Sequence, residues 1–227
     1  MAVTLDRNVL GQYRRFSLFN SPFPAHNHGC AIDLYPDGER APSPVAGEVL
    51  ATREVRAPPK PYAAKTDHLL VVDIGDRLAR ILHVDPAFGS GDRIRRGEDL
   101  GRLVRAGFFA PWVPNHLHLG FRAHGDDPYR ASGSLPIDVD VAVEGVCWDG
   151  TGTVAAAGDT WARLDSPAHP APGEQFVGLA SDGGVLDGGV PHYDGGGLLG
   201  GGEVAELLDT PVGAVDGRHV EWGDVQV

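Results

Sequence analysis

The chain is poor in several residue types, and each shortage excludes a class of protein. Only two of its 19 basic residues are lysines, and its 227 residues include one methionine and two cysteines. Two cysteines cannot build a disulfide framework, and they fit a reducing compartment. No apolar run approaches the roughly 18 residues of a membrane-spanning helix, and the first residues lack the apolar segment of a secretory signal. We therefore expect no membrane span and a cytoplasmic location.

Negative charge dominates the composition. The formal net charge is −12, and aspartate is much commoner than glutamate, at 22 residues against 9. An acidic surface repels nucleic acid and anionic lipid, so neither is expected as a partner. Abundant aspartate with almost no lysine is typical of proteins from salt-adapted cells. Because 42% of the residues are hydrophobic, the chain can build one large or two small domains.

The first 133 residues have the pattern of short β-strands separated by turns. Apolar runs of strand length occupy 45–51, 69–74, 78–84 and 117–121, with proline and glycine between them. Residues 99–107 also fit helical spacing, but Gly97 and Gly101 favour a strand and a turn. The pattern predicts an all-β fold, a β-sandwich or barrel.

The sequence changes character after residue 133. Residues 136–143 alternate apolar and acidic side chains, as a half-buried strand does. Residues 181–202 contain Asp-Gly-Gly and Gly-Gly-Gly runs, which predict a mobile loop or linker because glycine weakens a strand. We expect domains at 1–133 and 134–227, the second a smaller, β-rich and glycine-rich extension.

The most informative motif is His116-Leu117-His118. Residues two apart on a strand point to the same face, so the two imidazoles project side by side. One imidazole can bind a metal while the other handles protons at the same centre. Most His-x-His pairs on strands are ordinary polar pairs, so the motif needs support from elsewhere in the chain.

Two upstream segments supply that support. His28-Gly-Cys-Ala-Ile-Asp33 combines an imidazole and a carboxylate, and His83 lies in an apolar strand. The order of a His…Asp pair, a lone strand histidine and a His-x-His motif resembles the lysostaphin-type (LytM-like) zinc endopeptidases. The resemblance extends over roughly residues 20 to 125, because three further segments are similar to motifs of that family. Residues 41–50 are similar to its P-x-x-G-x-V strand, 67–76 to its V-x-I-x-H-G strand, and 91–101 to its V-x-x-G hairpin.

The resemblance implies a fold, a cofactor and a reaction. The fold would be the hybrid-motif type, like biotinyl and lipoyl domains. Zn²⁺ would be held by His28, Asp33 and His118, with His83 and His116 as unligated catalytic histidines beside the metal-bound water. Two imidazoles and one carboxylate leave a fourth zinc position open, as catalysis requires. The implied reaction is hydrolysis of a peptide bond in a peptide or peptide-crosslinked substrate.

One departure from the family pattern leaves alternatives open. The family separates its first His and Asp by four positions, whereas His28 and Asp33 are five apart, and positions five apart on a strand do not share a face. A bulge at Gly29 would restore the alignment. Otherwise His26 replaces His28, or the site is damaged. The second functional class is therefore a non-catalytic binding or structural protein that retains the peptidase fold. The oligomeric state and the role of 134–227 are not predicted.

Overall fold

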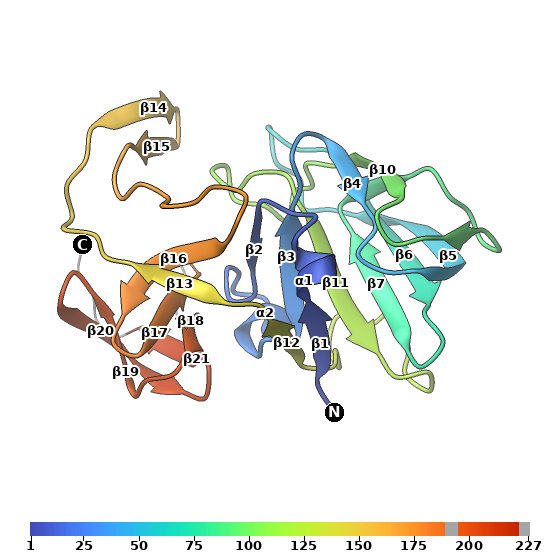
Figure 1. Cartoon of the computed structure of the whole chain (residues 1–227). Helices are drawn as coiled ribbons and strands as arrows, with labels where there is room; N and C mark the ends of the chain where they lie inside the picture. The colour runs from blue at the N-terminus through green and yellow to red at the C-terminus, as the bar shows by residue number, and fades with distance from the viewer. Residues whose placement is uncertain (189–194, 223–227) are drawn as a thin grey trace. The chain divides into compact units, whose positions relative to one another are not determined.

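The computed structural model describes residues 1–188 and 195–222, which form two compact units (Figure 1). The first unit comprises Met1–Phe16 and Cys30–Asp140, and the second comprises Ser17–Gly29 and Val141–Val227. Nearly all regular structure is β, in a curled sheet with additional sheets, which confirms the predicted all-β class. The division lies after Asp140 because β12 (Ile137–Asp140) pairs in parallel with β1 (Val3–Asp6).

The first unit is built around a seven-stranded sheet in the order β2-β3-β11-β7-β6-β5-β9, beside a three-stranded sheet in the order β4-β10-β8. A four-residue helix, α1 (Arg7–Leu10), follows β1, and the Asp6 side chain caps it by accepting from Val9 N at 3.0 Å. The strands of the two sheets are β2 (Arg15–Ser17), β3 (Ala31–Tyr35), β4 (Arg40–Pro42), β5 (Gly47–Arg56), β6 (Thr66–Asp73), β7 (Leu78–Leu82), β8 (Val84–Pro86), β9 (Arg93–Ile94), β10 (Asp99–Leu103) and β11 (Leu117–Arg122).

Strand β11 has two chemically different faces. It runs antiparallel to β3 on one side and β7 on the other. Leu117, Leu119 and Phe121 point to one face and are at most 1% exposed, in the core of the unit. Their neighbours His118, Gly120 and Arg122 point to the other face. The strand therefore contributes to the core and to a polar face at once.

Glycine is required where β10 approaches β8. Gly101 has φ +135°, and a Cβ at this position would lie 2.0 Å from Asp85 O. No side chain fits in that space, so Gly101 sets the close approach of the two strands. This strand confirms the expectation that 99–107 begins as strand rather than helix.

The second unit has its own seven-stranded sheet, in the order β13-β16-β17-β18-β21-β20-β19. Its core is a cluster of Leu198, Ala205, Val212 and Val220. A separate hairpin pairs β14 with β15. The elements of this unit are α2 (Pro24–Asn27), β13 (Val143–Val146), β14 (Val154–Gly158), β15 (Trp161–Leu164), β16 (Phe176–Ser181), β17 (Gly184–Asp187), β18 (Gly195–Gly200), β19 (Val204–Leu207), β20 (Thr210–Asp216) and β21 (His219–Trp222).

The expectation of a loop or linker over 181–202 is wrong for 184–187 and 195–200, which are strands. β17 and β18 pair antiparallel within it, while 189–194 lie outside the described residues. The glycines serve close packing, because a Cβ on Gly197 would lie 2.1 Å from Phe19 Cδ2 and one on Gly196 would lie 2.2 Å from Trp222 Cζ2. The strand therefore leaves the space that two aromatic rings occupy.

A buried carboxylate fixes the start of the Ser17–Gly29 segment within the second unit. Asp187 accepts hydrogen bonds from the Ser17 hydroxyl, from Leu18 N at 2.7 Å and from Phe19 N at 3.3 Å. We expect Asp187→Ala to lower the free energy of unfolding by about 2–4 kcal/mol near pH 5, since each buried donor left without an acceptor costs about 1–3 kcal/mol. Denaturant unfolding measures the loss.

The control is Asp165→Ala, which removes an exposed carboxylate that accepts from Thr153 N at 2.7 Å and should cost about 1 kcal/mol or less. Burial raises the pKa of Asp187 above its ordinary value, and its three hydrogen bonds only partly oppose this. A carboxyl group whose pKa is higher in the folded than in the unfolded protein stabilises the fold. This stabilisation is fully present at pH values below the pKa of the unfolded protein, near 4, and is lost as the pH rises through the pKa of the folded protein. The cost of Asp187→Ala should therefore shrink toward neutral pH; equal losses in the two variants would contradict this account.

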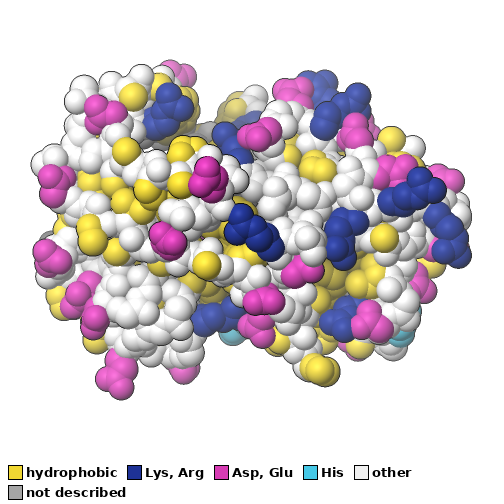
Figure 2. Space-filling model, in the orientation of Figure 1, with side chains coloured by type: hydrophobic (Ala, Val, Ile, Leu, Met, Phe, Trp, Pro, Cys, Tyr) yellow, Lys and Arg dark blue, Asp and Glu magenta, His cyan; other side chains and the backbone are white. Residues whose placement is uncertain are grey.

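None of the described helices has the length and apolar character needed to cross a membrane. On the face drawn in Figure 2, acidic side chains are scattered widely, in keeping with the net charge of −12.

Candidate metal centre

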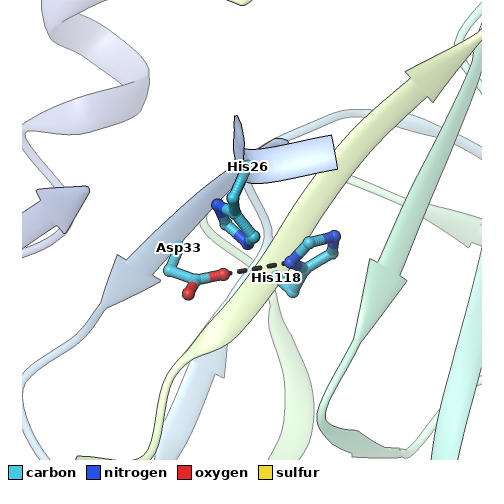
Figure 3. A group of neighbouring side chains, drawn as sticks. All are labelled: His26, Asp33 and His118. Atoms are coloured by element: carbon cyan, nitrogen blue, oxygen red, sulfur yellow. Dashed lines mark hydrogen bonds and ion pairs between the residues drawn. The ribbon is translucent and has the colours of Figure 1, made fainter. Parts of the chain in front are cut away.

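Paired strands bring a carboxylate and an imidazole together at the centre of the first unit. His118 on β11 pairs in register with Asp33 on β3, so both side chains project from the same face. His118 Nδ1 lies 3.0 Å from Asp33 Oδ1 (Figure 3). Asp33 is 3% exposed, so its carboxylate is largely withdrawn from water.

His116 reaches the same carboxylate from just before β11. Its Nε2 lies 3.1 Å from Asp33 Oδ2, while its Nδ1 faces Pro114 O at 2.9 Å. The ring stacks on Phe109 with centroids 4.3 Å apart and packs near Tyr35 at 4.9 Å. Since a carbonyl oxygen only accepts hydrogen bonds, Nδ1 carries the hydrogen and Nε2 faces Asp33. The His-x-His motif therefore places both of its imidazoles on one carboxylate.

His83 joins this face through an unusual backbone conformation. It directly follows β7 and has φ +70°, in the left-handed region, where histidine is among the enriched residues. This turn brings His83 Nδ1 to Asp67 Oδ2 at 2.5 Å, and Asp67 is fully buried. The His83 ring lies 5.3 Å from that of His116 and 5.9 Å from that of His118. The three predicted strand histidines are thus brought together.

A group that could hold a metal ion comprises His26, Asp33 and His118. Ligand atoms of these three residues lie within 4.8 Å of one another (Figure 3). His28 is exposed and forms the C-cap of α2. The residues before β3 therefore form a helical turn, so the alternation of a strand does not apply and no strand bulge at Gly29 is needed. This is the alternative that the five-residue spacing left open.

The donor set of this group could hold a metal ion. Two imidazoles and one carboxylate are a common catalytic set, and bonds near 2.1 Å place tetrahedral ligand atoms about 3.4 Å apart. His26 Nδ1 donates to Leu18 O at 2.6 Å, which leaves Nε2 for a metal, the usual arrangement for a ligating histidine.

The loop that precedes His116 is held by Arg105. Its guanidinium donates to Val113 O and Pro111 O, each at 2.6 Å, and to Ala110 O at 3.2 Å. Phe109, in this loop, is 5% exposed and contacts the rings of His83 and His116. The aromatic residue nearest the histidines therefore packs against them rather than standing open to solvent.

Sequence reasoning missed Asp67 and Arg105 as parts of this site. Asp67 carried one available signal, since it opens an otherwise apolar strand whose alternate residues, Leu69 and Val71, are buried. An acidic residue in such a series needs a partner. Arg105 donates to carbonyl oxygens of the loop and, at 3.5 Å, to the Asn115 side chain. No spacing pattern in the sequence predicts contacts of this kind.

Comparison with known proteins gives a family and one distant structural likeness. Residues 4–139 match the N-terminal domain of a family described as a domain of unknown function (DUF8155), and residues 144–227 match its C-terminal domain. No curated protein matches the chain. A solved structure described as the NMR solution structure of lysostaphin is similar with 17% identity and a TM-score of 0.30; the match covers 50% of this chain and 45% of that one.

Proposed function

The chain belongs to the DUF8155 family, whose function is unknown, through both of its domains, and we propose from its side chains that it is a zinc-dependent hydrolase. The bond that it cleaves is a peptide bond. One observation carries the proposal. The first unit gathers a possible metal ligand pair, Asp33 and His118, beside two further histidines, His83 and His116, on one face of a sheet. The last two lie outside the group that could hold the metal, so metal binding alone does not require them.

The residues around the group have distinct roles in this proposal. A zinc ion bound by His26, Asp33 and His118 would supply Lewis acidity and a water of lowered pKa. His83 is the better proton acceptor, because buried Asp67 holds its Nδ1–H and favours the charged ring that results. His116 is fixed by Pro114 O and by Phe109, and in the charged form of its ring Nε2 also carries a hydrogen, which it can donate to a developing negative charge.

Burial favours a second candidate, a protein that keeps the metal without catalysis. His116 is 3% exposed and His83 is 6% exposed, so a substrate must displace or pass the side chains that cover them. A structural zinc site has all its positions closed to solvent. The two candidates differ in a single measurable property, the presence of hydrolysis that depends on a residue outside the metal group.

The resemblance to the lysostaphin-type endopeptidases implies a bond next to glycine. The test is therefore cleavage of peptides with Gly–Gly bonds by the zinc-loaded full chain, in high-salt buffer, beside His116→Ala. We expect cleavage by the parent chain, and a loss of about 10²–10⁴-fold in the variant, the usual contribution of one positioned acid or base. Zinc content should not change. His124→Ala, at an exposed histidine, is the matched control. Zinc bound with no cleavage by the parent chain would overturn the hydrolase and support the non-catalytic protein.

A further inference from the structure

Two buried arginines lie on the same sheet face as the metal group. Arg80 on β7 pairs in register with Gly120 of β11, and Arg122 follows two residues later on β11. His118, Gly120 and Arg122 alternate along one face, and Arg80 shares that face through its pairing. At about 3.3 Å per residue, Gly120 lies roughly 7 Å from His118 along the strand. The arginines are therefore within one small molecule's length of the metal group.

Part of each buried guanidinium group lacks a hydrogen-bond acceptor among the described residues. Arg122 is fully buried and Arg80 is 7% exposed. Arg80 Nε, Arg122 Nε and Arg122 Nη1 are enclosed without an acceptor among the described residues, and the one bond that Arg122 makes runs from Nη2 to Arg130 O at 2.8 Å. No carboxylate in the described part of the chain forms an ion pair with either. Buried cations are normally paired, so this arrangement calls for an anion.

The charges of the two arginines persist despite their burial. Desolvation and the neighbouring Arg122 lower the pKa of Arg80 to about 10, with Asp127 opposing. Desolvation also lowers the pKa of Arg122, against the attraction of Asp126 and other nearby groups. Both side chains thus remain cationic at neutral pH and repel each other. An anion between them would relieve both the repulsion and the missing hydrogen bonds.

Gly120 is buried and lies between His118 and the arginines on this face. A Cβ at this position would meet no heavy atom closer than Ser134 Oγ at 3.5 Å and Cys30 O at 3.7 Å. A methyl group would therefore make only ordinary van der Waals contacts there, and the glycine adds no side-chain bulk between His118 and the arginines. This glycine does not have a positive φ, so backbone conformation does not require it.

We propose that Arg80 and Arg122 bind a carboxylate of the substrate, next to the bond that the metal group cleaves. The inference rests on the proposed hydrolase and adds a substrate class to it, peptides with a carboxylate close to the scissile bond. Paired guanidinium groups match the two oxygens of a carboxylate. The carboxylate belongs either to a peptide C-terminus or to an acidic side chain, because both offer the same two oxygens.

Calorimetric titration of metal-free protein tests this binding without hydrolysis. The full chain is stripped with EDTA, dialysed into buffer free of carboxylates, and titrated with acetyl-Gly-Gly, its C-terminal amide, and acetyl-Asp-Gly-amide. We expect at least one carboxylate probe to bind roughly tenfold or more tightly than the uncharged amide, the effect of one or two charge-assisted hydrogen bonds. The probe that binds, acetyl-Gly-Gly or acetyl-Asp-Gly-amide, identifies the source of the carboxylate.

Variants assign the binding to the arginine pair. Arg80→Gln and Arg122→Gln should each weaken it by about tenfold or more. The matched control, Arg102→Gln, alters an exposed arginine paired with Glu39 and should change nothing. If Arg122→Gln does not fold, Arg80→Gln decides alone. Equal affinity for acid and amide, no binding of any probe, or full binding by Arg80→Gln would overturn the proposal. Because no metal is present, this outcome is independent of whether the chain hydrolyses peptides.

Discussion

Elemental analysis of His118→Ala should find no zinc where the parent chain, reconstituted in high-salt buffer, holds about one zinc per molecule. His118 is in register with Asp33, and its Nδ1 lies 3.0 Å from the carboxylate. Its removal leaves one imidazole and one carboxylate, too few to hold zinc at a catalytic site. The loss should exceed the roughly 10–100-fold that follows when only an outer hydrogen-bond partner of a ligand is removed.

The same measurement distinguishes the two candidate histidines near α2. His26→Ala should lose zinc, because His26 falls within the group of three and its Nδ1–H is held by Leu18 O. His28→Ala should keep zinc, because the His28 side chain is exposed at the end of the helical turn. The two residues are two positions apart, so each variant is the other's control. Zinc lost from His28→Ala and kept by His26→Ala would contradict the ligand set.

Asp67→Asn should abolish most of the proposed hydrolysis while leaving the metal in place. Asp67 is fully buried and bonds to His83 Nδ1 at 2.5 Å and to His68 N at 2.8 Å. The amide preserves the shape, but it cannot stabilise a charged imidazole, and it permits the wrong ring tautomer. Loss of the carboxylate from such pairs lowers kcat by up to about 10⁴-fold. We expect a fall in kcat with KM little changed.

The control for this variant is Asp85→Asn, which alters an exposed carboxylate 3.8 Å from His68. It should leave kcat, KM and zinc content unchanged. A loss of zinc from Asp67→Asn would show that Asp67 acts only by holding the site together. A fall in kcat below about tenfold would remove His83 from the proton transfers proposed for it.

The sequence predicted the strands of the site better than the segments between them. Alternation on 117–121 correctly placed His118 opposite a buried core, because a strand has a fixed period of two. His83 was predicted within a strand, but it follows β7 in a left-handed turn that alternation does not describe. The helical turn of α2 is four residues long, too short to show any period, and so the choice between His26 and His28 stayed open.

The prediction of a loop or linker for the glycine-rich segment 181–202 was wrong for a different reason. Composition predicted low packing, whereas the glycines of β18 leave space for the rings of Phe19 and Trp222. Contacts between residues far apart in sequence decide whether glycine marks a loop or a close approach. The same holds for Asp67, whose partner His83 is 16 positions away. Pairings of this kind are properties of the folded chain, not of any local pattern.

The two faces of β11 tie the integrity of the site to that of the core. A slip of one residue between β11 and β3 would turn His118 and Arg122 toward the apolar core and turn Leu117, Leu119 and Phe121 toward the polar face. No partly shifted pairing can keep the chemistry while sacrificing stability, or the reverse. Insertions within this strand are therefore excluded, whereas the exposed residues 123–127 that follow it can accept a change of length. For library design, the strand is fixed and the loop after it is the place to vary.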